Sequence, residues 1–317
     1  MSIQRTFGYM LYRLRNQACI RSHDIEIYSD TSFSKRSIHL ERGARILFDF
    51  SHSSTHLGDR LFFAPIIFEL IRLGYQIYTS DNDGITNPLF QRLDAKVALD
   101  SVSSGENVDL VVIPSASLLA LNQRYTKNNL LIFQFTRAKN HDIIDDLGYA
   151  FSKITGLQIS DLSLTNFPQM VQSVNNKTDE NYFLFSNYID SGWFRKFMIN
   201  GSALEKKAYE LKKDGYRIIH IGSKDDLAGD SMDYKFVDID LRGTLSIVEL
   251  VDLISSKRIV GAVTYDNFIM HLVGIFDKKA FVLFRGRFLK HNVDLHINFV
   301  NSVFFRSYNN ISYLKNN

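Results

Sequence analysis

Two short segments of the chain carry residue types that can act on a bound molecule. Gly58-Asp59 follows an apolar run, and a carboxylate there can accept a proton from a hydroxyl group. The second segment runs Val263-Thr264-Tyr265-Asp266-Asn267-Phe268-Ile269-Met270-His271 and is typical of a buried strand that enters a helix. Free backbone N–H groups and the positive end of a helix dipole at such a place favour a diphosphate.

Each of these residues has a functional and a structural interpretation. Asp266 can bind sugar hydroxyls, and Asn267 and His271, four residues apart, share one helix face and can both reach a ligand. The structural alternatives are that Asp59 and Asp266 cap the helices that follow them and that His271 is a partly buried helix residue.

Three further positions are candidates for ligand contacts. His56 lies three residues before Asp59 and is a second candidate base on the acceptor side, beside Gly58. Gly222-Ser223 follows the apolar run 218–221 and is placed to face the base and ribose of a nucleotide, although a glycine there is as often only a turn.

Two Asp-x-Asp patterns, Asp81-Asn82-Asp83 and Asp238-Ile239-Asp240, have the spacing that holds a divalent metal in one class of sugar transferase. Neither is accompanied by a recognisable third ligand, and the first is typical of a turn. We therefore expect no metal site. The sequence also lacks a Walker loop, a dinucleotide glycine fingerprint and a zinc spacing.

Hydrophobic patterning places these residues on alternating strands and helices. In the first half we expect strands at 45–50, 75–79, 96–99, 109–113 and 130–135, with helices at 61–73, 88–93 and 115–124. In the second half we expect strands at 182–185, 216–221, 258–263 and 280–284, with helices at 203–213, 246–255 and 267–276. This alternation predicts two Rossmann-like α/β domains with parallel sheets, and ligands of such folds bind at the carboxyl ends of the strands. We expect the two sheets to face each other across a cleft.

The hydrophobic rhythm weakens between Thr165 and Asp179, which predicts the domain boundary. The predicted parts are a basic N-terminal extension, an acceptor domain, a nucleotide-sugar donor domain and a C-terminal segment, which span residues 1–44, 45–165, 180–287 and 288–317. The end of the last segment, rich in asparagine, is either a returning helix or a frayed tail.

Composition limits the classes of protein to which this chain can belong. Its 317 residues suffice for two ordinary domains, and its single cysteine, Cys19, excludes an intrachain disulfide. With no signal-peptide core and no long apolar run, a cytoplasmic protein is expected. The net charge of +3, without a nucleic-acid motif, gives no support for nucleic acid as a partner.

The opening segment is richer in Arg and Lys than in acids, and its charges alternate with aromatic and aliphatic residues. This pattern has two interpretations. Either the segment holds the protein against the anionic inner face of the cytoplasmic membrane, or it is a solvated arm packed on the first domain.

Several segments resemble glycosyltransferase family nine, the bacterial ADP-heptose:lipopolysaccharide heptosyltransferases. Leu57-Gly58-Asp59 with Pro65 is similar to that family's first loop and helix, and the segment 240–250 to the part before its donor loop. Arg258-Ile259-Val260-Gly261, Asp266 to His271, and Lys279 to Phe284 follow the family's strand, Asp-Thr-Gly-x-x-His loop and final strand. The chain departs where Asn267-Phe268 replaces Thr-Gly and Arg285-Gly286 replaces Gly-Pro.

The resemblance implies the two-domain GT-B fold and gives the candidate residues roles. Asp59 is then the catalytic base, Asp266 binds the donor sugar and His271 lies near the donor phosphates. The loop 186–196 occupies the place of a family loop that carries a lysine, so Arg195 or Lys196 neutralises the phosphate charge. Surface solvation is the alternative for both.

The expected activity is inverting, metal-independent transfer of a sugar from a nucleotide diphosphate to a hydroxyl of a bacterial surface glycan, such as lipopolysaccharide or another lipid-linked polysaccharide. No cofactor is needed beyond the donor substrate. Two alternatives stay open at this point: a sugar-nucleotide epimerase of related fold, and a non-catalytic nucleotide-binding protein of glycan assembly.

Overall fold

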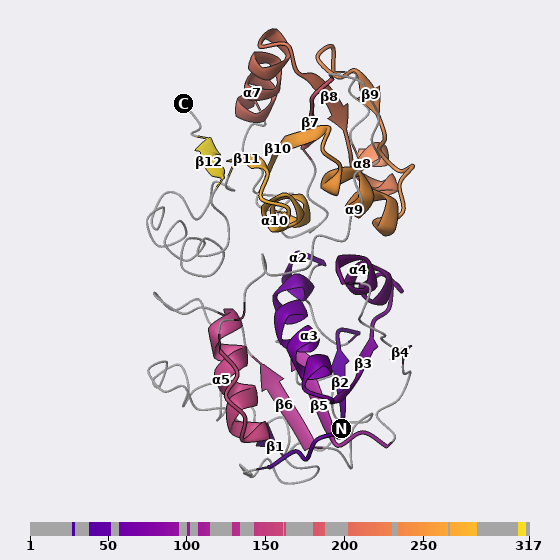
Figure 1. Cartoon of the computed structure of the whole chain (residues 1–317). Helices are drawn as coiled ribbons and strands as arrows, with labels where there is room; N and C mark the ends of the chain where they lie inside the picture. The colour runs from indigo at the N-terminus through magenta and orange to yellow at the C-terminus, as the bar shows by residue number, and fades with distance from the viewer. Residues whose placement is uncertain are drawn as a thin grey trace, which may run out of the picture. The chain divides into compact units, whose positions relative to one another are not determined.

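The computed structural model divides into two compact units, residues 1–164 and 165–317. It describes residues 27–28, 38–51, 57–94, 100–101, 107–114, 129–133, 143–160, 162, 180–187, 202–229, 234–265, 267–283 and 310–314. Each unit is an α/β body with a sheet of six described strands (Figure 1). The units meet in sequence at the start of the stretch 165–179.

The first unit alternates strands and helices along the chain. Its elements are β1 (Ile27–Tyr28), β2 (Arg45–Asp49), α2 (Leu57–Arg60), the 3-10 turn η1 (Leu61–Phe63), α3 (Ala64–Arg72), β3 (Gln76–Ser80), α4 (Thr86–Leu93), β4 (Asp100–Ser101), β5 (Leu110–Pro114), β6 (Asn129–Phe133) and α5 (Ile143–Thr155). The strand order is β1-β6-β5-β2-β3-β4, and every pair is parallel except β1 with β6. Without β1, this is the Rossmann order of five strands.

The second unit repeats this plan. Its elements are β7 (Tyr182–Ser186), α7 (Ser202–Lys213), β8 (Arg217–His220), α8 (Lys224–Gly229), β9 (Ile239–Asp240), α9 (Ile247–Ser255), β10 (Ile259–Tyr265), α10 (Phe268–Ile275), β11 (Lys279–Leu283) and β12 (Ile311–Leu314). The order β12-β11-β10-β7-β8-β9 is parallel throughout. It is the complete six-strand Rossmann order, and it confirms the predicted fold class.

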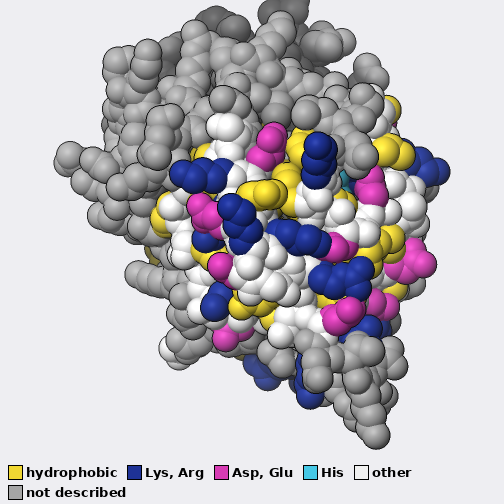
Figure 2. Space-filling model, turned by 90° about the horizontal axis from the view of Figure 1, so that it is seen from above, with side chains coloured by type: hydrophobic (Ala, Val, Ile, Leu, Met, Phe, Trp, Pro, Cys, Tyr) yellow, Lys and Arg dark blue, Asp and Glu magenta, His cyan; other side chains and the backbone are white. Residues whose placement is uncertain are grey.

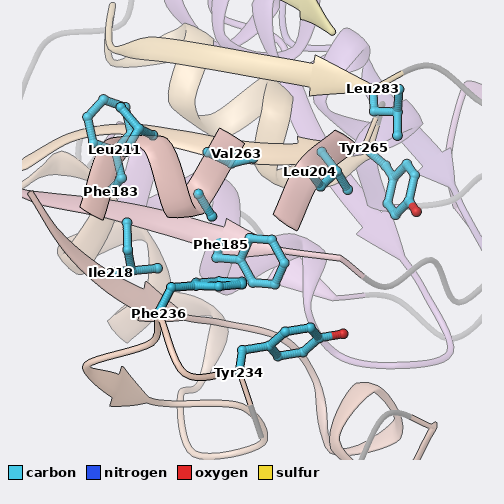
Figure 3. Packing of buried hydrophobic residues seen from close by; sticks show 11 residues of the cluster. Phe183, Phe185, Leu204, Leu211, Ile218, Tyr234, Phe236, Val263, Tyr265 and Leu283 are labelled. Atoms are coloured by element: carbon cyan, nitrogen blue, oxygen red, sulfur yellow. The ribbon is translucent and has the colours of Figure 1, made fainter. Parts of the chain in front are cut away.

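The central strands are almost continuous apolar runs because helices cover both faces of a parallel sheet. All five residues of β7 are buried, as are four of the five in β2. In the second unit, Phe183, Phe185 and Ile218 of the sheet pack against Leu204 and Leu211 of α7, which project from one face of that helix (Figure 3). This cluster is the core of the second unit.

Local signals account for two helices that the sequence predicted. Ser246 accepts a hydrogen bond from Glu249 N while the Glu249 carboxylate accepts one from Ser246 N, so α9 begins with a complete capping box. The burial of Leu204, Ala208 and Leu211 in α7 follows the 3.6-residue period.

The structure corrects the sequence at both ends of the chain. Ile311–Leu314 is a strand that pairs with β11, neither a helix nor a tail. Ile27–Tyr28, in the predicted N-terminal extension, pairs with β6 and so belongs to the first sheet. Helices α5 and α8 and strand β9 were not predicted. The predicted strand 96–99 and helix 115–124 lie outside the described residues, and no described helix is long and apolar enough to span a membrane.

Gly261 marks an irregularity in β10, where the pairing with β7 shifts register. A Cβ atom at this position would lie against the carbonyl oxygen of Lys279 and 2.6 Å from Phe183 Cε1. Both neighbours belong to adjacent strands and cannot withdraw without disturbing the sheet.

We expect Gly261→Ala to lower the free energy of unfolding by about 1–3 kcal/mol because it overpacks the sheet. Urea denaturation of the full chain measures the change, with the exposed Lys257→Ala as control. A Gly261→Ala protein as stable as the control would show that the strands can separate at this point.

Candidate functional site

The order of strands in the second unit reverses between β7 and β10, the place where open α/β sheets bind ligands. Ser186 ends β7, Asn187 follows it, and Asn267 follows β10 after one residue. The Asn267 Nδ2 atom donates to Ser186 Oγ at 3.4 Å, so the two chain segments meet at this point. The predicted donor residue Asn267 therefore lies at the switch point.

Asn267 is the N-cap of α10. Its Oδ1 accepts hydrogen bonds from Ile269 N at 3.0 Å, Met270 N at 3.4 Å and Thr264 Oγ1 at 3.0 Å. The structural alternative assigned the cap to Asp266, which was wrong, and Asp266 itself lies outside the described residues. Two first-turn N–H groups that we expected to be free for a phosphate are therefore occupied by Asn267.

His271 lies one turn further along α10 and is 6% exposed. Every neighbour from Ile269 to Ile275 in this helix is buried as well. His271 is therefore more buried than the partly buried helix residue of the structural alternative. Its place near donor phosphates stays a prediction.

Gly222 and Ser223 join β8 to α8. Ser223 N donates to Asp226 Oδ2 at 2.5 Å while Asp226 N donates to Ser223 Oγ at 3.2 Å, a reciprocal cap. A Cβ on Gly222 would lie 2.8 Å from that of Asp226, so the turn requires glycine. Gly222 O also accepts from Gly243 N at 2.9 Å, which joins the loops after β8 and β9.

Sequence reasoning missed a buried polar group beside this turn. His220 Nε2 lies 3.0 Å from Asn187 Oδ1, and Asn187 Nδ2 donates to Tyr234 Oη at 2.7 Å. His220 is 1% exposed and Tyr234 is 8% exposed. The signal in the sequence that could have indicated this group is His220, a histidine at the end of an apolar strand.

Asp238 and Asp240 hold cations of the protein rather than offering a vacant metal site. Asp238 accepts from Ile218 N and pairs with Lys212, and these contacts lower its carboxyl pKa although burial acts to raise it. The hydrogen bond from the buried Arg242 is the main cause of the lowered pKa of Asp240. The described residues contain no cluster of His, Cys, Asp and Glu that could hold a metal ion.

In the first unit, the strand order reverses between β2 and β5, and α2 follows β2. Gly58 is buried and Asp59 is half-buried in the first turn of α2. Asp59 is not the cap of the next helix, because the N-cap residues of η1 and α3 are Arg60 and Phe63, and neither makes a side-chain cap hydrogen bond. The carboxylate that we predicted as a base therefore lies after the switch strand, and His56 lies outside the described residues.

Arg60, the neighbour of Asp59, fixes α2 to the turn after β3. Its Nη1 and Nη2 atoms each donate to one oxygen of Asp83 at 2.8 Å, and Nη1 donates to Thr86 Oγ1 at 3.0 Å. Burial acts to raise the pKa of Asp83, but the hydrogen bonds and charge of Arg60 outweigh it and the pKa is lowered. Asp81 accepts from Gly84 N and Thr86 N, so the first Asp-x-Asp pattern is a turn.

Lys, Arg, Asp and Glu side chains are intermixed on the described part of the face in Figure 2. The ion pairs of the second unit show the same mixture: Lys207 with Glu210, and Arg217 with both Glu180 and Asp238. Charges of opposite sign this close largely neutralise each other's field. Arg195 and Lys196, the predicted phosphate contacts, lie outside the described residues.

Two Rossmann units in one chain are also the arrangement found in GT-B glycosyltransferases. Solved structures of this class have the same fold. E. coli ADP-heptose lipopolysaccharide heptosyltransferase II aligns with a TM-score of 0.57 and 13% identity over 86% of this chain and 91% of its own.

Two further structures agree with this assignment of the fold. A family 9 glycosyl transferase of Veillonella parvula has a TM-score of 0.52 and 13% identity over 76% of this chain and 80% of its own. E. coli heptosyltransferase WaaC with ADP has a TM-score of 0.52 and 12% identity over 75% and 86%. No protein-family model and no curated protein matches the sequence. The resemblance to family nine is thus confirmed in the fold.

We expect Asn267→Ala to lower the free energy of unfolding by about 1 kcal/mol, because two N–H groups of α10 lose their acceptor. Asn267→Ser keeps a capping oxygen and should lose less. Chemical denaturation of both variants measures the difference. Equal stability of the two would mean that the cap does not hold this helix.

Proposed function

We propose that this protein is a glycosyltransferase that moves a sugar from a nucleotide diphosphate to a hydroxyl of an acceptor. One observation carries the proposal: both sheets have Rossmann order, and residues that can bind a ligand follow a strand at the switch point of each. In the first unit this is the carboxylate of Asp59 after β2, and in the second it is the N-terminus of α10 after β10. The fold shared with ADP-heptose transferases supports the same reading.

The second unit binds the donor in this proposal. The positive end of the α10 dipole lies at the switch point and favours the diphosphate, although Asn267 takes two of its N–H groups. Arg195 or Lys196 neutralises the charge that develops on the leaving diphosphate. Asp266 binds sugar hydroxyls, His271 lies near the phosphates, and Gly222-Ser223 faces the ribose and base.

The first unit supplies the base. Asp59 takes the proton from the acceptor hydroxyl as its oxygen bonds to the anomeric carbon, and the bond from that carbon to the diphosphate oxygen breaks. A single displacement inverts the anomeric configuration. The nucleoside diphosphate leaves with the bonding electrons, so one carboxylate suffices, and His56 and Gly58 lie on the acceptor side.

The acceptor class, the location and the lack of a metal requirement belong to the same proposal. A lipid-linked bacterial surface glycan fits an enzyme that works at the inner face of the cytoplasmic membrane, with the basic opening segment against anionic lipid. Metal-independent transfer is part of the proposal, because the α10 dipole and Arg195 or Lys196 would stabilise the charge of the leaving diphosphate instead.

A second candidate function rests on a specific observation at the donor site. Asn267 occupies N–H groups that a phosphate would need, and Phe268 stands where glycine would let a phosphate approach the backbone. Both features favour a non-catalytic nucleotide-binding protein. Binding and transfer measured separately distinguish the two functions.

We expect a nucleoside diphosphate, or its sugar conjugate, to raise the melting temperature of the purified protein, because a ligand of the native state stabilises it. ADP, GDP, UDP and their sugar conjugates, with CMP-linked sugars as a fourth class, form the screen. The shift should disappear in Asp266→Ala and persist in the exposed Asp225→Ala. An absence of any shift at millimolar ligand would contradict a donor site.

We expect Asp59→Asn to lower the rate of sugar transfer by about 10²–10⁴-fold, the usual contribution of a general base, with donor binding unchanged. Release of nucleoside diphosphate in the presence of a lipid-linked glycan acceptor measures transfer. Glu69→Gln, on α3 of the same unit, is the matched control. Full activity in Asp59→Asn would remove Asp59 from the mechanism.

A further inference from the structure

Three side chains from three segments, the buried His220 and Tyr234 and the half-buried Asn187, form one polar group at the carboxyl edge of the second sheet. Asn187 follows β7, His220 ends β8, and Tyr234 precedes β9. Because Asn187 Oδ1 can only accept, the Nε2 atom of His220 carries the proton in their 3.0 Å hydrogen bond. Asn187 Nδ2 donates in turn to Tyr234 Oη at 2.7 Å, so both ends of the Asn187 carboxamide are held.

Aromatic rings surround this group and hold its geometry. The ring of Phe185 lies 5.0 Å from that of His220 and 5.4 Å from that of Tyr234, and 5.0 Å from that of Phe236. Figure 3 shows Tyr234, Phe236 and Phe185 packed together, with the Tyr234 hydroxyl toward the end to which the strand arrows point. The polar atoms therefore lie at the ligand-binding edge of an otherwise apolar core.

Stability alone does not explain such a group. A buried imidazole or hydroxyl that leaves water recovers at best its lost hydrogen bonds, whereas apolar side chains of the same size would stabilise the core without that requirement. What a satisfied polar group adds is a fixed geometry, since each hydrogen bond has a required direction. The geometry fixed here is that of Asn187.

Asn187 is the first residue after β7, at the carboxyl edge of the second sheet. The preceding residue, Ser186, is bonded to Asn267, the cap of α10. Asn187 thus connects the end of β7 to β8, and Ser186 connects it to the start of α10. The start of α10, whose dipole favours the diphosphate in the proposed function, is therefore held by this pair.

We propose that His220, Asn187 and Tyr234 are positioning residues that fix the carboxyl end of β7 beside the start of α10, and so the place of the donor diphosphate. The inference rests on the proposed function and deepens it, because it names the residues that shape the donor site without touching the donor. His220 and Tyr234 act through Asn187.

The test is isothermal titration of the full chain with ADP, GDP, UDP and CDP. Tyr234→Phe keeps the ring and removes the acceptor oxygen. It should weaken binding of the preferred nucleotide about fivefold, as expected for one lost hydrogen bond. His220→Phe should weaken it further, and His220→Gln, which restores an N–H donor, should recover part of the loss.

Tyr182→Phe is the matched control. Tyr182 lies at the amino end of β7, and its hydroxyl donates to Glu180 at 2.5 Å. The substitution therefore removes a hydroxyl from the same strand, but at the edge of the sheet opposite the proposed donor site. We expect its nucleotide affinity to equal that of the wild type. Melting temperatures of the unliganded variants separate lost stability from lost affinity.

The possible results separate this inference from the proposed function. If the wild type binds a nucleotide and Tyr234→Phe binds it equally well, even with a lower melting temperature, the positioning role is wrong and the donor site stands. If the wild type binds none of the four nucleotides, the proposed function and this inference both fail.

Discussion

The hydrogen bonds of the Asn267 carboxamide hold together the carboxyl edge of the second sheet, where the candidate donor site lies. Its oxygen holds Ile269 N, Met270 N and the Thr264 hydroxyl, and its nitrogen reaches Ser186. One side chain therefore fixes the start of α10 relative to β10 and β7, on both sides of the switch point. Replacing an N-capping residue costs only about 1 kcal/mol in many helices, but here the same atoms also set the geometry of a candidate binding edge.

The alternation of strands and helices could be predicted from the sequence because each central element carries its own signal. The runs Arg45–Asp49, Tyr182–Ser186 and Ile259–Tyr265 are apolar over most of their length, as buried parallel strands require. Strand order could not be predicted, because partners far apart in sequence decide it. The edge strands Ile239–Asp240 and Ile311–Leu314 are short and half-exposed, so their patterns did not distinguish them from loops.

Residues of the candidate site could be predicted only where neighbouring residues in the sequence indicate their role. Asp59 and Asn267 were found because each follows an apolar strand, yet the role of Asn267 as a cap depends on its oxygen, which the sequence does not orient. His220 with Tyr234, and Arg60 with Asp83, escaped prediction. Each pair joins segments that are separate in sequence, and no local pattern records the contact.

The two hydrogen bonds from the Arg60 guanidinium to the Asp83 carboxylate also bear on how this protein can diverge in evolution. Surface loops usually accept insertions and deletions because few contacts constrain them. The turn from Asp81 to Thr86 is different, since a change in its length would move the carboxylate that anchors Arg60, and with it the adjacent Asp59. We expect lineages to keep this turn's length constant, or to lose the arginine and the aspartate together, while the other connections of the first unit vary freely.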